Sequence, residues 1–460
     1  MKINNLPNIL LITTDQQKAS ATGIYGNKTV KTSMWGQFAK EGVTFERCFS
    51  TSPICAPSRI SILTGMYPLT HGVTCNHNDP EHVNKSLRQL PELLNESGYE
   101  TACIGNGLGD LSGGWDYNID FYDSAYGLND IFKQADELSR KVKPLNGWIS
   151  GVHPVSAKNG VAAKTTDYAL QYVEKQRKKP FFLHAAYMEP HPPYFPPEPY
   201  ASMYNPDEID LPENPDVLNR PKWQNEAARE MNIDKATEID IKLAIARYYG
   251  LISYADEQIE RLLDKLKESG ILENTWIIIT SDHGDYAGEH GLFAKSEALY
   301  DCLLHVPLVI RAPDGALSPG KRIGEMVQLV DIFSTICEIA GVKVPDLCQS
   351  YSLIPYMNGL KNVFKRQAVF AAVGGNINKK ASFPQGMPVR GIHSDVIKMV
   401  RTTNRKYIND ESNGHEYYDL DKDPDEIHNI FAGSDNSEII EMKDLLFSWE
   451  ENCKKYLINK

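Results

Sequence analysis

The chain alternates short apolar segments with longer segments of helical periodicity, and this pattern constrains its fold more than any other feature. Apolar segments of strand length occur at residues 8–13, 100–104, 181–187, 275–280 and 306–311. Around them, apolar side chains recur at helical spacing in residues 32–40, 86–96, 161–178, 252–270 and 329–340. Repeated alternation of this kind predicts an α/β fold with a mostly parallel sheet flanked by helices on both faces.

The pattern changes after about residue 345. Strand-like segments follow at residues 398–403, 405–409 and 417–420, and a helical segment at 437–452. At 460 residues the chain is long enough for more than one unit. We therefore expect an α/β domain over residues 1–345 and a smaller α+β subdomain over residues 346–460, with antiparallel strands and a terminal helix.

The composition excludes several classes of partner. The formal net charge of −12 at pH 7 argues against general binding to nucleic acid or to anionic membranes. No apolar run reaches the ~20 residues of a membrane span, and the stretch 9–12 lacks the length and cleavage site of a signal peptide. We expect a cytoplasmic protein that binds neither nucleic acid nor membrane; its oligomeric state is left open. An anionic substrate would need a local cationic pocket or a metal ion.

Polar side chains follow two of the predicted strands where these strands end. Asp15 and Gln16 come after the strand at 8–13, and Asp282 and His283 follow the one that ends at Thr280. Ligands of open α/β sheets lie beyond the carboxyl ends of strands, so these side chains converge if the two strands are neighbours. Two carboxylates, an amide oxygen and an imidazole would form a divalent metal site. The alternative is structural, with the carboxylates as helix caps and the histidine as a buried, hydrogen-bonded side chain.

A second chemical signal lies in residues 55–65. Pro57 favours the start of a helix and Gly65 its end. Cys55 would then lie at a helix N-terminus, where unpaired N–H groups and the helix dipole favour an anion. Arg59, one turn further on, can point back to the same place. This arrangement predicts an oxyanion-binding pocket with a nucleophile, whereas the alternative is a buried cysteine before a helix.

The segment Cys-Ala-Pro-Ser-Arg at residues 55–59 resembles the signature of the type I sulfatases, the formylglycine-dependent family of the alkaline-phosphatase-like superfamily. The resemblance extends, in the same order, over most of the chain. Other matching segments are residues 7–12 with 15–16, 67–68, 71–73, 190–194, 281–285, 288–292, 295, 306–308, 418–420 and 423–426. An alkaline-phosphatase-like α/β fold is what this resemblance implies.

The resemblance also implies a reaction. A formylglycine-generating maturation enzyme would oxidise Cys55 to an aldehyde that hydrates to a gem-diol. One hydroxyl would attack sulfur and displace the alcohol, and the second would expel sulfate and regenerate the aldehyde. Such chemistry needs a divalent cation beside the nucleophile. Ca²⁺ is the first choice for that cation, with Mn²⁺ or Mg²⁺ as alternatives.

Site residues follow from the same resemblance. The metal ligands would be Asp15, Gln16, Asp282 and His283. Arg59 and Lys295 would neutralise charge on the transferring group, and His191 would protonate the leaving oxygen. Asn76 and Asn106 are the candidates for substrate binding. Further candidates are Asp285 and His290, as residues that orient ligands or cap local structure, and Arg401 and Arg405, as hairpin side chains within reach of substrate.

Two features depart from the common pattern. Many sulfatases have Gly-Lys-x-His after the strand that corresponds to residues 100–104, whereas this chain has Gly-Asn-Gly-Leu at 105–108. Asn106 can donate a hydrogen bond but brings no positive charge, and Leu108 replaces the histidine. The metal-ligand pairs resemble the branch of phosphonate monoester hydrolases and choline sulfatases, and the phosphonate enzymes also lack this lysine and histidine.

We therefore expect a metal-dependent sulfatase that hydrolyses the sulfate ester of a small sulfated carbohydrate, such as a mono- or disaccharide. The second hypothesis is a phosphonate monoester or phosphodiester hydrolase that uses the same site. A third hypothesis is a non-catalytic binder of sulfated ligands.

Overall fold

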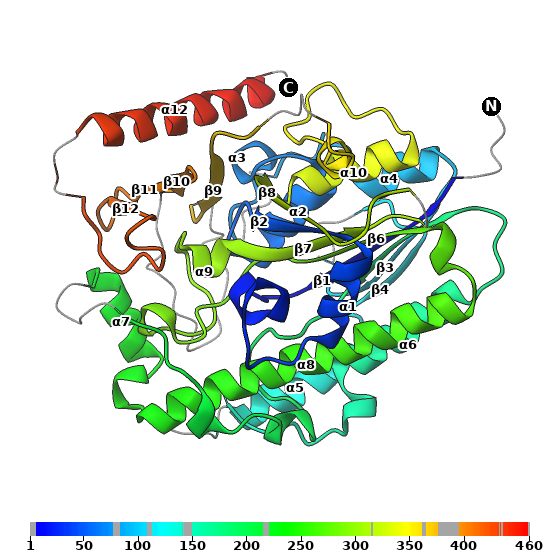
Figure 1. The fold of residues 1–460 in the computed structure, drawn as a ribbon, viewed down its shortest axis with the longest axis horizontal. Coiled ribbons are helices and arrows are strands. Elements are labelled where there is room, and N and C mark those ends of the chain that lie inside the picture. Colours follow the sequence, from blue (N-terminus) through cyan, green and yellow to red (C-terminus); the bar gives the residue numbers. More distant parts are fainter. Residues whose placement is uncertain are drawn as a thin grey trace.

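The structure is a computed structural model, and it describes residues 6–76, 83–107, 113–139, 141, 150–214, 220–313, 316–360, 365–375, 395–431, 433 and 436–458. An eight-stranded sheet runs through the centre of the molecule, with helices on both faces (Figure 1). Its strand order is β4 (Tyr117–Asp120), β3 (Glu100–Gly105), β5 (Phe181–Ala186), β1 (Asn8–Thr14), β6 (Thr275–Ser281), β7 (His305–Arg311), β2 (Val43–Phe49) and β8 (Lys321–Gln328). β7 is antiparallel to β6 and β2, and the other pairs are parallel. The predicted α/β class with a mostly parallel sheet is confirmed.

Helices cover the sheet on both sides. The helices of the described residues are α1 (Ser33–Glu41), α2 (Cys55–Thr64), α3 (Pro68–His71), α4 (Leu90–Glu96), α5 (Leu128–Ser139), α6 (Val161–Val173), α7 (Lys222–Glu230), α8 (Glu238–Glu268), α9 (Asp301–Leu304), α10 (Asp331–Ala340), α11 (Ile354–Met357) and α12 (Ser437–Ile458). None of the helices in the described part of the chain is both long enough and apolar enough to cross a membrane.

The central strands are buried on both faces, as a sheet covered by two helical layers requires. Leu10 and Ile12 of β1 pack in the core formed with α1, α6 and α8. Ile9 and Leu11, which point to the opposite face, pack with α2, α4 and α10. This continuous apolar run is what the sequence pattern of β1 predicted, and it anchors the strand whose end carries Asp15.

A second sheet lies in the C-terminal part of the chain. Its four antiparallel strands are ordered β12 (Glu416–Asp419), β11 (Arg405–Asn409), β10 (Ile397–Arg401) and β9 (Val369–Val373). Helix α12 packs over it, with Met442 and Trp449 in one apolar cluster with Val400 and Tyr407. The antiparallel strands and the terminal helix are as predicted, and the boundary at 345/346 stays a prediction.

Buried ion pairs join the small sheet to the main domain. Lys406 of β11 is fully buried and pairs with Asp301 at 2.6 Å and also with Glu426. Arg401 pairs with the same Asp301 at 2.9 Å, and Arg405 pairs with Asp419 at 2.8 Å. The two hairpin arginines, considered as substrate contacts from the sequence, are therefore engaged in ion pairs within this interface and the small sheet.

Several predicted boundaries were wrong. The helix expected from residue 86 begins at Leu90, because Gln89 and Glu92 form a capping box and Pro91 occupies the first turn. The helix expected to reach residue 178 ends at Val173. Strands β2, β4, β8 and β9 were missed. The outer strand β8 carries charged and partly exposed side chains, which hide the apolar pattern of a strand.

Candidate active site

Two carboxylates and an imidazole lie together because β1 and β6 are neighbours. The strands pair in parallel with Thr14 opposite Ser281, so Asp15 and Asp282 both follow at the carboxyl edge of the sheet. The N–H of Asp282 donates to the carbonyl of Thr14 at 3.2 Å and holds the two chain segments together. Asp15, Asp282 and His283 are fully buried. The two predicted strand ends therefore do converge.

Cys55 reaches the same place from helix α2. The helix begins at Cys55 after an extended Ile54, and it ends at Gly65, whose φ of +68° is the left-handed conformation that glycine favours. The hydroxyl of Ser58 donates to the carbonyl of Asp282 at 2.6 Å, which ties the first turn of α2 to the end of β6. Cys55 thus lies at a helix N-terminus that favours an anion, as the sequence predicted.

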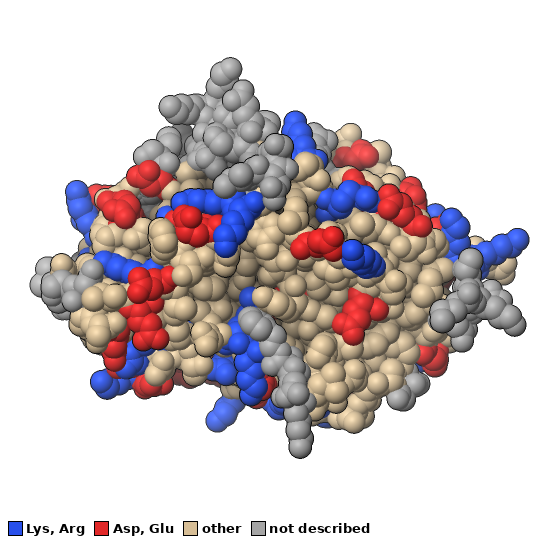
Figure 2. Space-filling view, turned by 90° about the horizontal axis from the view of Figure 1, so that it is seen from above, with Lys and Arg blue, Asp and Glu red and all other residues tan. Residues whose placement is uncertain are grey.

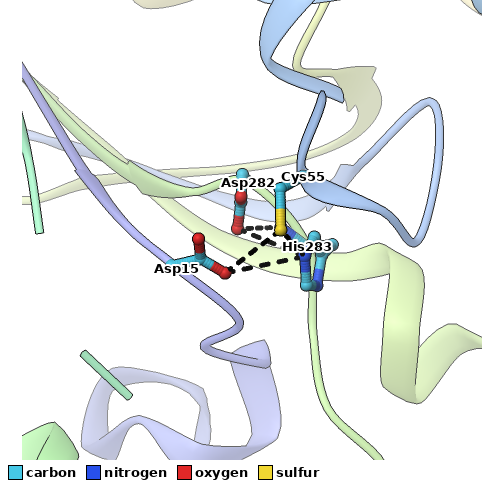
Figure 3. A group of neighbouring side chains, drawn as sticks. All are labelled: Asp15, Cys55, Asp282 and His283. Atoms are coloured by element: carbon cyan, nitrogen blue, oxygen red, sulfur yellow. Dashed lines mark hydrogen bonds and ion pairs between the residues drawn. The ribbon is translucent and has the colours of Figure 1, made fainter. Parts of the chain in front are cut away.

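The four side chains form a compact group with the donor atoms of a metal site. Ligand-type atoms of Asp15, Cys55, Asp282 and His283 lie within 4.8 Å of one another, and Figure 3 shows the side chains gathered around a common centre. His283 donates from Nδ1 to the carbonyl of Gly284 at 2.9 Å, so Nε2 carries the lone pair, 3.3 Å from Cys55 Sγ. Burial lowers the pKa of His283 to about 4, which leaves the ring neutral with Nε2 as its cation-binding atom. Lys295 Nζ lies 3.3 Å from this nitrogen.

Arg59 joins the two carboxylates. Its Nε donates to Asp282 Oδ2 and its Nη2 to Asp15 Oδ2, both at 2.9 Å, and its Nη1 donates to the carbonyl of Asn106. Burial lowers the pKa of Arg59, but Asp282 and Asp15 raise it above its ordinary value. Burial raises the pKa of Asp282, but the neighbouring charges, among them those of Arg59 and Lys295, lower it by more, so the net pKa falls. The ion pairs are therefore fully charged, and they fix the two carboxylates in one arrangement.

Lys295 lies against Cys55. Its Nζ is 2.8 Å from Cys55 Sγ and 3.8 Å from Asp15 Oδ1. Burial lowers the pKa of Lys295, but Cys55 and Asp15 raise it above its ordinary value, so the lysine is cationic. Burial and then Asp15 raise the pKa of the Cys55 thiol to about 12. The unmodified side chain is therefore a protonated thiol, whereas the reactive form of cysteine is the thiolate.

Gln16 is held at three of its four polar groups. Its φ of +75° is unusual for a residue other than glycine. The backbone N–H donates to Asp282 Oδ1 at 3.0 Å, the carbonyl accepts from Tyr248 at 2.9 Å, and Nε2 donates to Asp285 Oδ2 at 2.6 Å. The remaining atom, Oε1, is buried and has no hydrogen-bond partner among the described residues. A buried acceptor of this kind fits a ligand of a cation.

His191 follows β5 on a segment rich in proline. Its Nδ1 donates to the carbonyl of Pro192 at 2.5 Å, so Nε2 is the ring atom left for exchange of a proton with a ligand. Burial, and then the charge of Lys295, lower the pKa of His191 well below its ordinary value. The ring is therefore neutral in the protein alone.

The two asparagines contact the cluster in different ways. Asn76 accepts the N–H of Ala56 through Oδ1 at 3.0 Å, next to Cys55. Asn106 is buried and donates from Nδ2 to Asp15 Oδ2 at 2.8 Å. It therefore supports Asp15, whereas the sequence led us to expect a contact with the substrate. Leu108 lies outside the described residues.

Some side chains that shape the site were given no role from the sequence. Ser58 and Tyr194 lie in segments 55–59 and 190–194, which match the sulfatase pattern. That match was the sequence feature that could have identified them as site residues. Tyr248 of α8 offered no signal, since its role depends on a hydrogen bond across 232 residues. His290, by contrast, stacks on Tyr300 at 4.0 Å between ring centroids and belongs to the surrounding packing.

The charges of the cluster are local. On the face seen in Figure 2, the described Lys and Arg side chains are interspersed with Asp and Glu, without a continuous patch of one sign. The whole chain carries a net charge of −12. Attraction of an anion therefore depends on the site itself, where the buried Lys295 lies next to Cys55.

Comparisons with known proteins agree with this geometry. A sulfatase family model matches residues 7–342, and a model described as N-sulphoglucosamine sulphohydrolase, C-terminal, matches residues 288–451. The chain is 28% identical to an arylsulfatase of Clostridium perfringens, over 95% of this chain and 92% of that one. It is 27% identical to an N-acetylglucosamine-6-O-sulfatase of Bacteroides thetaiotaomicron, over 98% and 87%.

Solved structures share the fold. A phosphonate monoester hydrolase of Agrobacterium radiobacter superposes with a TM-score of 0.80 at 23% identity, over 97% of this chain and 96% of that one. A protein in complex with its substrate D-glucosamine-2-N,6-O-disulfate has a TM-score of 0.77 at 24% identity, over 98% and 99%. The sulfatase model covers well over half of the chain. The predicted resemblance is thereby confirmed: the chain belongs to the sulfatase family, whose members are sulfuric ester hydrolases that depend on a divalent metal and formylglycine.

Proposed function

We propose that this sulfatase hydrolyses the sulfate ester of a small sulfated carbohydrate, with Cys55 matured to formylglycine and Ca²⁺ as the first choice of cation. The observation that carries the proposal is the position of Cys55. Its Sγ lies 2.8 Å from Lys295 Nζ and 3.5 Å from Asp15 Oδ1, at the start of a buried helix. A nucleophile at this position lies beside both a buried cation and the oxygens of a metal-binding carboxylate.

The donor set fits a divalent cation. Two carboxylates, the imidazole Nε2 of His283 and the unpartnered Oε1 of Gln16 combine oxygen and nitrogen donors, which suits Ca²⁺, Mn²⁺ or Mg²⁺. When bound, the cation would supply positive charge that favours a deprotonated nucleophile and a sulfate oxygen. The anchoring of Asp15 and Asp282 by Arg59 keeps these ligands in place before the cation arrives.

The chain's own side chains provide the rest of the chemistry. Lys295 lies where it can neutralise the charge of the sulfuryl group, and the helix dipole of α2 acts in the same direction. His191 protonates the leaving oxygen from Nε2, because its Nδ1 is committed to Pro192. A bound sulfate ester would offset the charge of Lys295 and favour the protonated ring. Asn76, next to Cys55, contacts the sulfuryl group as a neutral donor through its amide nitrogen.

The carbohydrate part of the proposal is supported by two comparisons and by Tyr122. One relative is named an N-acetylglucosamine-6-O-sulfatase, and one structural neighbour holds a glucosamine disulfate. Tyr122 follows β4 at the same sheet edge as Asn106, and 62% of its surface is exposed. An exposed aromatic ring there can pack against a sugar ring.

A phosphonate monoester or phosphodiester hydrolase is the second candidate. The observation in its favour is the set of side chains at the site. Gln16 and His283 among the metal-binding candidates, and a neutral Asn106 that supports Asp15, are the features in which this chain resembles the phosphonate enzymes. Sulfate esters and phosphonate monoesters share tetrahedral geometry and a single negative charge, so one site can accept both.

Oxidation of Cys55 is directly measurable. In protein produced in a host with the maturation enzyme, peptide mass spectrometry should detect formylglycine at position 55. Cys55→Ala should lower turnover of an aryl sulfate by about 10⁴-fold or more, because the nucleophile is lost. Cys337→Ala, which removes a buried thiol of α10, is the matched control and should keep turnover. A wholly unmodified thiol in active protein would contradict the mechanism.

Substrate preference separates the two candidates. We expect kcat/KM for an aryl sulfate to exceed the values for the matched phosphonate monoester and phosphodiester, because the family and the curated relatives are sulfatases. The three substrates should carry the same leaving group and be assayed with one preparation of matured enzyme. If the phosphonate were faster by orders of magnitude, the second candidate would replace the first.

The role of Tyr122 can be tested by truncation. Tyr122→Ala should raise KM for D-glucosamine-2-N,6-O-disulfate by about 3- to 10-fold with kcat nearly unchanged, since contacts of one aromatic ring contribute about 0.5–1.5 kcal/mol. A small alkyl sulfate should show no change, because it has no ring to pack. Tyr351→Ala, at an exposed tyrosine after α10, is the control. An equal effect on both substrates would argue against a sugar platform.

A further inference from the structure

The side-chain amide of Gln16 has a single orientation that its surroundings permit. An amide presents two donors at one end and an acceptor at the other. The donor end lies 2.6 Å from Asp285 Oδ2, and an ionised carboxylate only accepts. If the amide were reversed, Gln16 Oε1 would face that carboxylate and two acceptors would meet. The present orientation leaves Oε1 on the side away from Asp285, buried and unpartnered among the described residues.

Asp285 is itself fixed from two sides. Its Oδ1 accepts the N–H of Ala287 at 2.7 Å, and its Oδ2 accepts the hydroxyl of Tyr194 at 2.6 Å. Both Asp285 and Tyr194 are fully buried, and Tyr194 in turn accepts the N–H of Ala294 at 3.1 Å. The carboxylate therefore cannot turn away from Gln16 without breaking other hydrogen bonds.

The backbone of Gln16 is fixed as well. Its N–H is bound to Asp282 and its carbonyl to Tyr248, and the left-handed φ of +75° sets the direction in which the side chain leaves the backbone. The residue follows Asp15 directly and its N–H contacts Asp282, so Gln16 stands next to the two carboxylates of the cluster. Each polar group of Gln16 except Oε1 therefore has a hydrogen-bond partner within the protein.

We propose that Asp285 is a positioning residue that holds the Gln16 amide with Oε1 toward the divalent cation. This inference rests on the proposed function, because it requires a cation between Asp15 and Asp282. It also gives Tyr194 a role. Tyr194 lies on the same segment as His191, and its hydrogen bond to Asp285 supports the residue that orients Gln16. If Oε1 is already oriented before the cation binds, no free energy is needed to rotate the amide on binding.

Asp285→Asn should invert this arrangement. If the introduced amide keeps its oxygen on the N–H of Ala287, its NH₂ group faces Gln16. The Gln16 amide then turns over to accept from that NH₂ group, and its own NH₂ group faces the cation. A donor directed at a cation repels it, so affinity for Ca²⁺ and Mn²⁺ should fall by about 10- to 100-fold.

The double variant Q16E/D285N should restore binding. The carboxylate introduced at position 16 can accept from the NH₂ group introduced at position 285 with one oxygen and present the other oxygen to the cation. Q16E alone places two carboxylates in contact, and we expect it to bind more weakly than the double variant. The recovery of affinity by a second substitution is a readout that a merely structural role of Asp285 would not produce.

The measurement is calorimetric titration of Ca²⁺ and Mn²⁺ into the full chain after removal of metal with a chelator. Thermal unfolding with and without cation provides a second readout, because a bound cation raises the melting temperature according to its affinity. The matched control is Asp234→Asn, at an exposed aspartate outside the site, which should bind like the wild type. In chelator, D285N, Q16E/D285N and Asp234→Asn should unfold at temperatures similar to that of the wild type, whereas Q16E should unfold at a lower temperature because its two carboxylates repel each other.

Equal affinity of D285N and the wild type would overturn this inference and leave the proposed function standing. A double variant that binds no better than D285N, or that fails to fold although its donor and acceptor are paired, would also overturn it. A wild-type protein that binds neither cation would contradict both this inference and the metal-dependent mechanism.

Discussion

The buried guanidinium of Arg59 is the interaction on which the site depends. Asp15 and Asp282 stand 267 positions apart in the sequence and are brought to one sheet edge by the pairing of β1 with β6. Two buried carboxylates so close together repel each other, and Arg59 compensates both with hydrogen bonds of 2.9 Å. Since Arg59 stands one turn after Cys55 on α2, the same side chain fixes the nucleophile relative to the carboxylates.

This arrangement assigns Arg59 to the framework of the site rather than to the substrate. All of its described contacts are with Asp15, Asp282 and Asn106. Lys295 is the cation left to face the reacting group, next to Cys55. Asn106 supports Asp15 where many relatives carry a lysine, so the site has fewer free positive charges. A site of this kind suits substrates with a single negative charge, which sulfate monoesters and phosphonate monoesters both carry.

The sequence was sufficient to predict which residues meet. Asp15 and Asp282 follow apolar strands, and the rule that parallel strands present their carboxyl ends at one edge brings them together. Cys55 before Pro57 predicted a helix start, and the helix begins there. The strand order could not be predicted, because it depends on packing between segments far apart in the chain. The antiparallel direction of β7 could not be predicted either, because its apolar run gives the same pattern in a parallel and in an antiparallel strand.

Finer features of the site depend on geometry that no motif encodes. The orientation of the Gln16 amide follows from Asp285 and Tyr194, which stand 269 and 178 positions away in the chain. Asn106 was expected to face the substrate, and only the structure places its amide on Asp15. The late start of α4 followed from a capping box at Gln89 that apolar periodicity overlooked.

Anomalous diffraction from a crystal of the matured protein grown with Mn²⁺ tests the central claim most directly. The account predicts one strong peak bounded by Asp15, Gln16, Asp282 and His283, adjacent to residue 55, with Arg59 still bound to both carboxylates. An ion located elsewhere, with this cluster empty, or an Arg59 that leaves the carboxylates when the ion binds, would contradict it.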